Sequence, residues 1–246
     1  MRRDKTLGTI FAALTEVLFP SRCLACLSLL PDGSRHSLCP ACDARIRYIK
    51  EPLCPVCGLP FEAGTTTSHP CGACLKERPP FDVARALGRY EGPLLEVIHR
   101  FKYRKDTAAG EALGRLAASY PFFDFSFTAY DVLVPVPLHL RRLRERGFNQ
   151  ALVLGRVVAR HHHLALDFDA VARHRDTTPQ VSLDGKDRRE NVRDAFVVVR
   201  PQCLEGKRVL LVDDVFTTGS TVSECARVVK KAGAAWVGVF TVARVV

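Results

Sequence analysis

The sequence lacks several features that would mark it as something other than a globular protein. No uncharged apolar run reaches the roughly 18 residues that a membrane-spanning helix requires, so we expect no membrane span. Glycine and proline, with 16 and 15 of 246 residues, are not in excess, and 47% of the residues are apolar. These proportions exclude fibrous and disordered chains. A helicase-type P-loop is also absent. A chain of this length can bury one sizeable core or carry a small module beside it.

The first 20 residues begin basic and continue with spaced apolar residues. A secretory signal has the same order, but Glu16 interrupts the apolar run and no small-x-small cleavage site precedes Phe19-Pro20. Apolar residues three and four positions apart are typical of one face of an amphipathic helix. We therefore predict such a helix over residues 1–20 of a cytoplasmic protein. Its apolar face would comprise Leu7, Ile10, Phe11, Leu14, Val17 and Leu18.

Acidic residues are few relative to basic ones. The chain has 26 Asp and Glu against 36 Lys and Arg, which gives a net charge of +10 with neutral histidines. A surplus of this size favours anionic partners, such as phosphorylated small molecules, nucleic acid or a lipid surface. Charge alone does not select among these partners. The sequence also leaves the oligomeric state open, a dimer included.

Eight of the ten cysteines form four C-x-x-C pairs. Two thiolates at this spacing can bind one metal ion, and a second pair completes a tetrahedron around zinc. Disulfide frameworks are the alternative, but they space their cysteines irregularly and belong to oxidising compartments. We therefore predict two structural zinc sites within residues 21–78. In tandem pairing the ligands are Cys23, Cys26, Cys39 and Cys42 for one site, and Cys54, Cys57, Cys71 and Cys74 for the other.

Spacing leaves an interleaved pairing of the cysteines open as well. His36 and His69 lie close to the pairs, but eight thiolates already fill two sites. The net charge of residues 1–80 is only +3, from ten basic and seven acidic residues, which is low for a nucleic-acid-binding finger. We expect this module to have a structural or docking role.

A second domain is predicted over residues 79–246, after the linker sequence Arg78-Pro79-Pro80. Strand and helix patterns alternate there, which is typical of a largely parallel sheet with helices on both faces. Ligands of such folds bind at the carboxyl ends of the strands. The predicted strands are 83–90, 132–134, 196–199, 209–212 and 236–242, and the predicted helices are 94–101, 110–119, 149–162 and 220–231.

One strand end carries a concentration of polar residues. The apolar run 209–212 is followed by Asp213 and Asp214, and then by a hydroxyl- and glycine-rich turn that opens a helix. Backbone N–H groups at a helix N-terminus bind phosphate, and Gly219 allows a close approach. Helix capping is the alternative interpretation, but one residue suffices for a cap. The turn comprises Thr217, Thr218, Gly219, Ser220 and Thr221.

Residues 209–221 closely resemble the phosphoribosyl pyrophosphate (PRPP) motif of type I phosphoribosyltransferases, with Phe216 where these enzymes usually have an aliphatic residue. The chain from about residue 19 onward is similar to the ComF/GntX family of competence-associated, phosphoribosyltransferase-like proteins. The stretches that carry this resemblance are the cysteine pairs and residues 101–104, 134–151 and 178–191.

The resemblance implies roles for these residues. Asp213 and Asp214 would hold the ribose hydroxyls and the magnesium shell, and residues 217–221 would bind the 5-phosphate. A pyrophosphate loop would follow the strand 132–134, with Arg144 and Arg146 as catalytic contacts among four arginines, the others being Arg141 and Arg142. Residues 173–193 would form a hood over the site.

The implied function is transfer of a phosphoribosyl group from Mg-PRPP to an acceptor that the sequence does not identify. Members that salvage 6-oxopurines have a carboxylate base where this chain has Thr217, which argues against that substrate class. His139 and His174 are weaker acid–base candidates by position. The alternative is a non-catalytic adaptor that responds to PRPP or nucleotides and docks a competence or DNA-processing protein, or single-stranded DNA.

Overall fold

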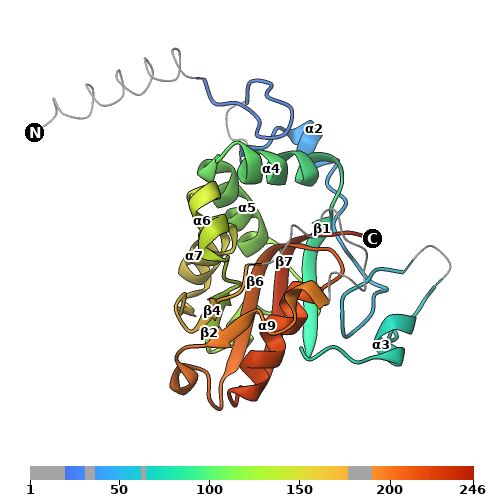
Figure 1. Cartoon of the computed structure of the whole chain (residues 1–246). Helices are drawn as coiled ribbons and strands as arrows, with labels where there is room; N and C mark the ends of the chain where they lie inside the picture. Colours follow the sequence, from blue (N-terminus) through green and yellow to red (C-terminus); the bar gives the residue numbers. More distant parts are fainter. Residues whose placement is uncertain (1–19, 31–36, 62–64, 177–189) are drawn as a thin grey trace, which may run out of the picture.

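The computed structural model describes residues 20–30, 37–61, 65–176 and 190–246 (Figure 1). The expected N-terminal helix and the middle of the expected hood lie outside these ranges, as does His36. In the part of the chain that is described, no helix is long and apolar enough to cross a membrane.

A five-stranded parallel sheet forms the centre of the molecule. Its order is β1-β7-β6-β2-β3, so the strands that follow one another in the chain are joined by crossovers. This confirms the parallel sheet expected from the alternating pattern. The strands are β1 (Val83–Arg89), β2 (Val132–Pro135), β3 (Ala165–Leu166), β6 (Arg208–Phe216) and β7 (Trp236–Arg244).

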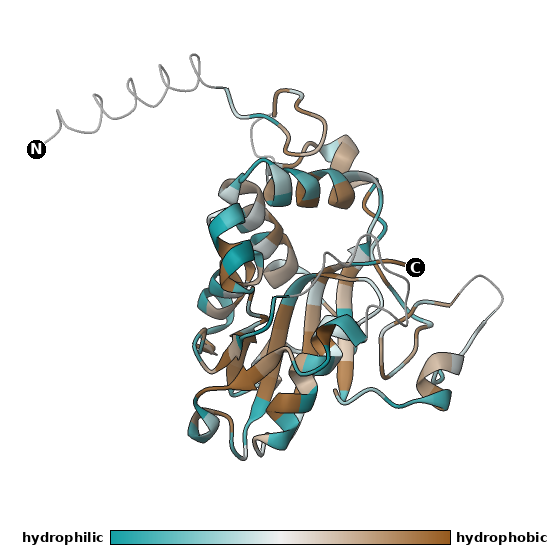
Figure 2. Cartoon of the chain, viewed as in Figure 1, coloured by the Kyte–Doolittle hydropathy of each residue, from teal (hydrophilic) through white to brown (hydrophobic). Residues whose placement is uncertain are grey.

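Helices cover both faces of the sheet, because successive apolar residues of its strands point to opposite faces and both sets have to be buried. In β6, Leu210 and Val212 belong to one buried cluster, whereas Val209 and Leu211 belong to the other. The strands are accordingly apolar along their central length (Figure 2). The first cluster includes α4 (Gly92–Tyr103), α5 (Thr107–Ser119) and α7 (Gln150–His162), and the second includes α9 (Ser220–Lys231).

Two segments of the second domain differ from the pattern of the main sheet. The segment 196–199 does contain a strand, β5 (Phe196–Val198), but it pairs antiparallel with β4 (Val171–Arg173) in a separate two-stranded sheet. Val197 is 44% exposed, which a strand buried on both faces of the main sheet would not allow. The arginines after β2 lie in a helix, α6 (Leu140–Arg146), and not in a loop.

The cysteine-rich module protects the outer edge of β1. Its backbone forms hydrogen bonds along this edge: the Ile49 N–H donates to the Leu87 carbonyl (3.0 Å), and the Arg89 and Ala84 N–H groups donate to the carbonyls of Arg47 (2.8 Å) and Val56 (2.7 Å). An unpaired strand edge would be open to association. The module also contains two short helices, α2 (Pro40–Asp43) and α3 (Gly72–Lys76). Two 3-10 turns complete the described elements, at Phe127–Ala129 and Pro201–Cys203.

Candidate functional site

The two aspartates lie near the carboxyl end of β6, which continues to Phe216. Asp213 is half-buried and Asp214 is 7% exposed. The Asp214 N–H donates to Asp213 Oδ1 at 2.9 Å, so neither carboxylate caps the following helix. Asp214 instead pairs with the Lys102 ammonium at 3.0 Å. The capping alternative therefore does not explain these acids.

Two basic residues balance the acids. Lys102 lies in the last turn of α4, beside the buried stripe of that helix, and Arg173 ends β4. Burial would lower the pKa of Lys102, but the Asp214 carboxylate outweighs it and raises that pKa. Burial likewise lowers the pKa of Arg173, against the attraction of Asp213. We call these four residues, Asp213, Asp214, Lys102 and Arg173, the acid cluster.

The pKa of Asp213 is raised from 3.8 to about 7, because burial and the neighbouring Asp214 carboxylate both disfavour its ionised form. The sequence assigned no partner to either aspartate, although Lys102 lies in the stretch 101–104 that carries the family resemblance. The sequence places Lys102 directly after Phe101 at the edge of an apolar helix face, but only the fold shows that it is 15% exposed and therefore requires a partner.

The turn after β6 is shaped by one glycine. Gly219 has φ = +77°, and a Cβ there would lie 2.5 Å from the Phe216 ring. The Thr218 hydroxyl accepts a weak hydrogen bond from the Ser220 N–H (3.4 Å) and contacts the Ser220 hydroxyl (2.8 Å). We call residues 217–221 the hydroxyl turn. It combines hydroxyls with the positive end of the α9 dipole, an arrangement that suits an anion.

The arginines of α6 differ from one another in their surroundings. Arg141 pairs with Asp176 and Glu145, both at 3.2 Å, and Arg142 pairs with Glu145 at 3.0 Å. The half-buried Arg146 donates to Gln150 at 3.0 Å, whereas Arg144 is exposed. Sequence reasoning grouped the four together because it placed them in a loop.

The charge of Arg142 contributes to lowering the pKa of Arg173, a member of the acid cluster. The two histidines named as weaker candidates form other hydrogen bonds. His139 is the N-cap of α6, where its Nδ1 accepts from the Arg141 N–H (3.3 Å). The backbone N–H of His174 donates to the Ala195 carbonyl.

The eight paired cysteines form two clusters in the tandem arrangement. In each cluster the four sulfurs lie within 4.8 Å of one another. The distances Cys26–Cys39 and Cys57–Cys71 are both 3.7 Å between sulfurs. A zinc ion with Zn–S bonds of about 2.3 Å requires sulfurs about 3.8 Å apart, so zinc fits both clusters. We call Cys23, Cys26, Cys39 and Cys42 the first zinc site, and Cys54, Cys57, Cys71 and Cys74 the second zinc site.

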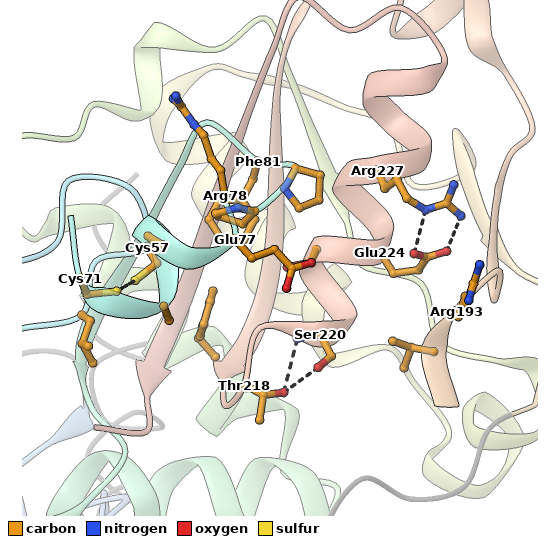
Figure 3. Close-up of a pocket in the computed structure, with 18 of the residues that line it drawn as sticks. Cys57, Cys71, Glu77, Arg78, Phe81, Arg193, Thr218, Ser220, Glu224 and Arg227 are labelled. Carbon is orange, nitrogen blue, oxygen red and sulfur yellow. Dashed lines mark hydrogen bonds and ion pairs between the residues drawn. The ribbon is translucent and has the colours of Figure 1, made fainter. Parts of the chain in front are cut away.

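A cavity of about 590 Å³ separates the second zinc site from α9 (Figure 3). Cys57 and Cys71 line one side, and Glu224 and Arg227 line the other, where they form an ion pair at 2.6 Å. Thr218 lies at its base, so the cavity meets the hydroxyl turn. The segment 78–80, predicted as a linker, forms part of the wall together with Phe81.

Comparison with known proteins agrees with this architecture. Residues 14–75 match the family model of a double zinc ribbon domain, and residues 149–245 match that of a phosphoribosyl transferase domain. The fold and its cysteine clusters thus define a phosphoribosyltransferase-like protein with an N-terminal double zinc ribbon and two zinc-binding sites of four cysteines each.

Two curated relatives cover nearly the whole chain. DNA utilization protein YhgH of Escherichia coli (strain K12) is 37% identical over 229 residues, which are 92% of this chain and 97% of that protein. Competence protein F of Haemophilus influenzae is 34% identical over 230 residues, 92% of this chain and 98% of its own. The chain belongs to this family, the ComF/GntX family.

Among solved structures, glutamine PRPP amidotransferase from B. subtilis, complexed with ADP and GMP, aligns with 55% of this chain and 26% of its own at 21% identity and a TM-score of 0.38. The family assignment depends on the two relatives and not on this weaker similarity.

Proposed function

We propose that the phosphoribosyltransferase-like domain binds Mg-PRPP at the carboxyl end of β6. The observation that carries this proposal is the position of an aspartate pair next to a hydroxyl-rich, glycine-containing turn at the N-terminus of α9. In this assignment the hydroxyl turn, Thr217, Thr218, Gly219, Ser220 and Thr221, binds the 5-phosphate. Asp213 and Asp214 hold the ribose hydroxyls and the magnesium shell.

The donor set suits magnesium, which prefers carboxylate oxygens together with substrate phosphates. When bound, the ion would neutralise charge on the diphosphate of PRPP. Asp214 is engaged by Lys102 in the structure. Lys102 therefore keeps the carboxylate oriented and compensated until the ligand binds, and its ammonium is then available to a phosphate oxygen.

The reaction we propose is phosphoribosyl transfer. The bond between C1 of the ribose and the pyrophosphate oxygen breaks, the pyrophosphate leaves with the bonding electrons, and a nucleophile of the acceptor forms the new bond to C1. Arg144 and Arg146 are assigned to the leaving pyrophosphate, with a fork of N–H donors that matches phosphate oxygens. Thr217 cannot act as a carboxylate base there, so we assign the acceptor to a class other than 6-oxopurines.

The alternative is an adaptor that binds PRPP without transferring the ribosyl group. The names of the relatives, which refer to DNA utilization and competence, favour a context of DNA uptake. The net charge of +10 is compatible with single-stranded DNA or with a phosphorylated ligand. In either case residues 21–78 form the docking module and residues 79–246 the ligand-binding domain. We place the protein in the reducing cytoplasm, where zinc thiolates persist.

Calorimetric titration with PRPP, with and without Mg²⁺, tests the binding proposal. We expect saturable binding that depends on magnesium. Product analysis over a panel of nucleobases and amines then separates the alternatives, because transfer releases pyrophosphate only with the right acceptor. Binding without pyrophosphate release across the panel would favour the adaptor, and absence of binding would contradict both.

A further inference from the structure

Arg244, the last residue of β7, is a buried arginine in an unusual setting. It is 7% exposed, yet no carboxylate lies within ion-pairing distance of it among the described residues. Its Nη1 donates to the Cys57 carbonyl at 2.6 Å, and its Nη2 lies 3.8 Å from the Cys57 sulfur. A buried guanidinium without a negative partner is strongly unfavourable. In the part of the chain that the structure describes, the negative charge in contact with it is that of the second zinc site.

The zinc site can supply this charge. A zinc ion with four thiolates carries two formal negative charges, and ligand sulfurs are stabilised by surrounding hydrogen-bond donors. Backbone N–H groups of Cys57 and Cys71 already donate to Cys54 Sγ, at 3.5 and 3.3 Å. Arg244 adds a charged donor to Cys57 Sγ. Its N–H groups are thus placed to stabilise the negative charge of a zinc tetrathiolate.

The other face of the Arg244 guanidinium packs on one aromatic ring, which lies beside the hydroxyl turn. Arg244 stacks on Phe216 at 4.3 Å, and Phe216 contacts Phe81 edge-on at 6.2 Å. The Phe216 ring also occupies the space beside Gly219, where an added Cβ would clash at 2.5 Å. Phe216 is the residue at which the chain departs from the PRPP motif that it otherwise resembles. Its ring connects the zinc site to the turn, which an aliphatic side chain would not do through stacking.

We propose that Arg244 is a positioning residue that couples the second zinc site to the hydroxyl turn. It neutralises the zinc tetrathiolate on one side, and on the other it holds Phe216 against Gly219, in the conformation that binds the 5-phosphate. This step rests on the proposed function, because the turn is taken as the 5-phosphate site. Coupling of this kind is reciprocal, so zinc must favour the ligand and the ligand must favour zinc by the same factor.

The first zinc site provides an internal control. Among the described residues its sulfurs contact the Ser28 hydroxyl (3.0 Å from Cys26 Sγ) and the Cys39 N–H (3.4 Å from Cys23 Sγ), and no arginine or lysine. Its zinc ion is expected to be insensitive to ligand at the turn.

The experiment measures the rate at which zinc leaves the full-length protein for a chelating dye, with and without saturating ribose 5-phosphate. In the wild type we expect the ligand to slow the release of one of the two ions by about fivefold or more. Arg244→Met should accelerate release of that ion by about tenfold or more, abolish its protection, and weaken ribose 5-phosphate binding. Arg244→Lys keeps the charge but loses the stack, so it should retain zinc better than Arg244→Met and still lose the coupling.

Two further variants complete the test. Arg208→Met is the matched control, because Arg208 lies at the other end of β6 and stacks on Trp236 at 5.0 Å, far from either zinc site along the strand; it should behave as the wild type. Phe216→Leu should leave zinc release without ligand as in the wild type, but remove the protection. If Arg244→Met does not fold, Arg244→Lys and Phe216→Leu carry the test.

Cobalt substitution provides a readout that a purely structural role would not change. Loss of the N–H···S hydrogen bond in Arg244→Met should shift the thiolate-to-cobalt charge-transfer band, and Arg208→Met should not shift it. Unchanged bands would overturn the contact with zinc. If Arg244→Met binds ribose 5-phosphate as tightly as the wild type does, and the ligand still slows its zinc release, the coupling is overturned and the PRPP site stays intact. A wild type that binds neither ribose 5-phosphate nor PRPP would instead remove the proposed function, and with it the coupling.

Discussion

The two zinc ribbons have the same ligand pattern but support different halves of the candidate site. The first zinc site shares a buried cluster with α4, the helix that presents Lys102 to the acid cluster. The second zinc site shares the other cluster with Phe81, Phe216 and the buried face of α9, which surround the hydroxyl turn. Each ribbon is therefore adjacent to the element that positions one group of ligand-binding residues.

The two contacts also differ in chemistry. Around the first ribbon the buried contacts are apolar: Leu38 and Ile46 join the buried cluster, and Tyr48 stacks on Tyr120 at 4.7 Å, while its ion pair from Arg47 to Glu91 at 3.2 Å is exposed. The second ribbon adds a charged contact, from Arg244 to Cys57. Apolar packing fixes a position without responding to charge, whereas a buried charge contact depends on the metal that compensates it. Two similar modules thus differ in role: the first ribbon supports α4 by packing, whereas the second ribbon, in our proposal, is coupled to the hydroxyl turn by a charge.

The largest expected effects come from removing one zinc site at a time. Cys23→Ser with Cys26→Ser, and Cys54→Ser with Cys57→Ser, should each reduce two zinc ions per chain to one, by elemental analysis under reducing conditions. Structural zinc contributes on the order of 10 kcal/mol to folding of its module. Hydrogen exchange should then show loss of protection near α4 in the first variant and near the hydroxyl turn in the second.

This outcome would distinguish the two ribbons, because only the second variant should weaken ribose 5-phosphate binding directly. Loss of protection in the same segments for both variants would show that the ribbons act as one unit. Fewer than one zinc ion per wild-type chain would contradict both sites.

Lys102→Met tests the half of the site supported by the first ribbon. It leaves Asp214 buried without its partner, and breaking such a pair costs about 3–5 kcal/mol. Burial and Asp214 raise the pKa of Asp213 from 3.8 to about 7, so the folded state holds this proton more tightly than the unfolded state. The stability from this group is present at low pH and is lost as pH rises through about 7.

Removal of the Lys102 charge raises the pKa of Asp213 further. Urea denaturation should therefore show a larger destabilisation of Lys102→Met at pH 8 than at pH 5. Equal destabilisation at the two pH values would mean that Lys102 does not act on Asp213 and contributes only through Asp214 and packing. Zinc release from the second site should stay unchanged in this variant, which separates the two halves.

Asp213→Asn should separate binding from stability. The amide oxygen can still accept the Asp214 N–H, and repulsion between the two carboxylates disappears, so the melting temperature at pH 8 should stay constant or rise. Mg-PRPP binding should weaken at least tenfold, about 1.4 kcal/mol, in calorimetry. Normal binding would remove Asp213 from the ribose site. Adding Asp214→Asn gives a less informative variant, because it leaves Lys102 without a charged partner.

Local patterns were sufficient to predict most of the fold. Alternating apolar strands and periodic helices indicated the parallel sheet, because burial on both faces leaves a clear signature in 209–212 and 236–242. The short strand β5 was predicted but its separate sheet was not, because three residues carry too little pattern to distinguish a buried strand from an exposed one. The helix α6 was missed because its seven residues bury no side chain, so no apolar stripe marks it.

For the site, the residues adjacent in sequence could be identified, and those brought together by the fold could not. The aspartates, the hydroxyl turn and the cysteine pairs form compact motifs. Lys102, Arg173 and Arg244 come from three other elements, and their partners lie 112, 40 and 187 positions away in the chain for Asp214, Asp213 and Cys57 respectively. Only tertiary structure shows that their charges are compensated.

The smallest expected effect concerns α6, and it tests whether this helix belongs to the half of the site that binds the diphosphate. In the proposed site, ribose 5-phosphate engages the hydroxyl turn and the two aspartates, whereas PRPP also presents the diphosphate. Arg146→Lys keeps the charge but loses the planar fork of donors, so it should weaken PRPP binding by a few-fold, about 1 kcal/mol, and leave ribose 5-phosphate binding unchanged. Arg144→Lys is the parallel variant for the other assigned arginine on the same helix, which is exposed whereas Arg146 is half-buried against Gln150.

Calorimetry with both ligands at low and moderate ionic strength makes the result specific. A basic surface that merely attracts anions would tolerate Arg→Lys, and its affinity for both ligands would fall together as salt is added. A selective loss for PRPP in Arg146→Lys would place the α6 arginine at the diphosphate, because the two ligands differ only in that group. If Arg144→Lys caused the same selective loss, both arginines would act there, as the family resemblance implies. Equal losses for the two ligands would remove Arg146 from the site and leave diphosphate binding to Lys102 and Arg173, the basic members of the acid cluster.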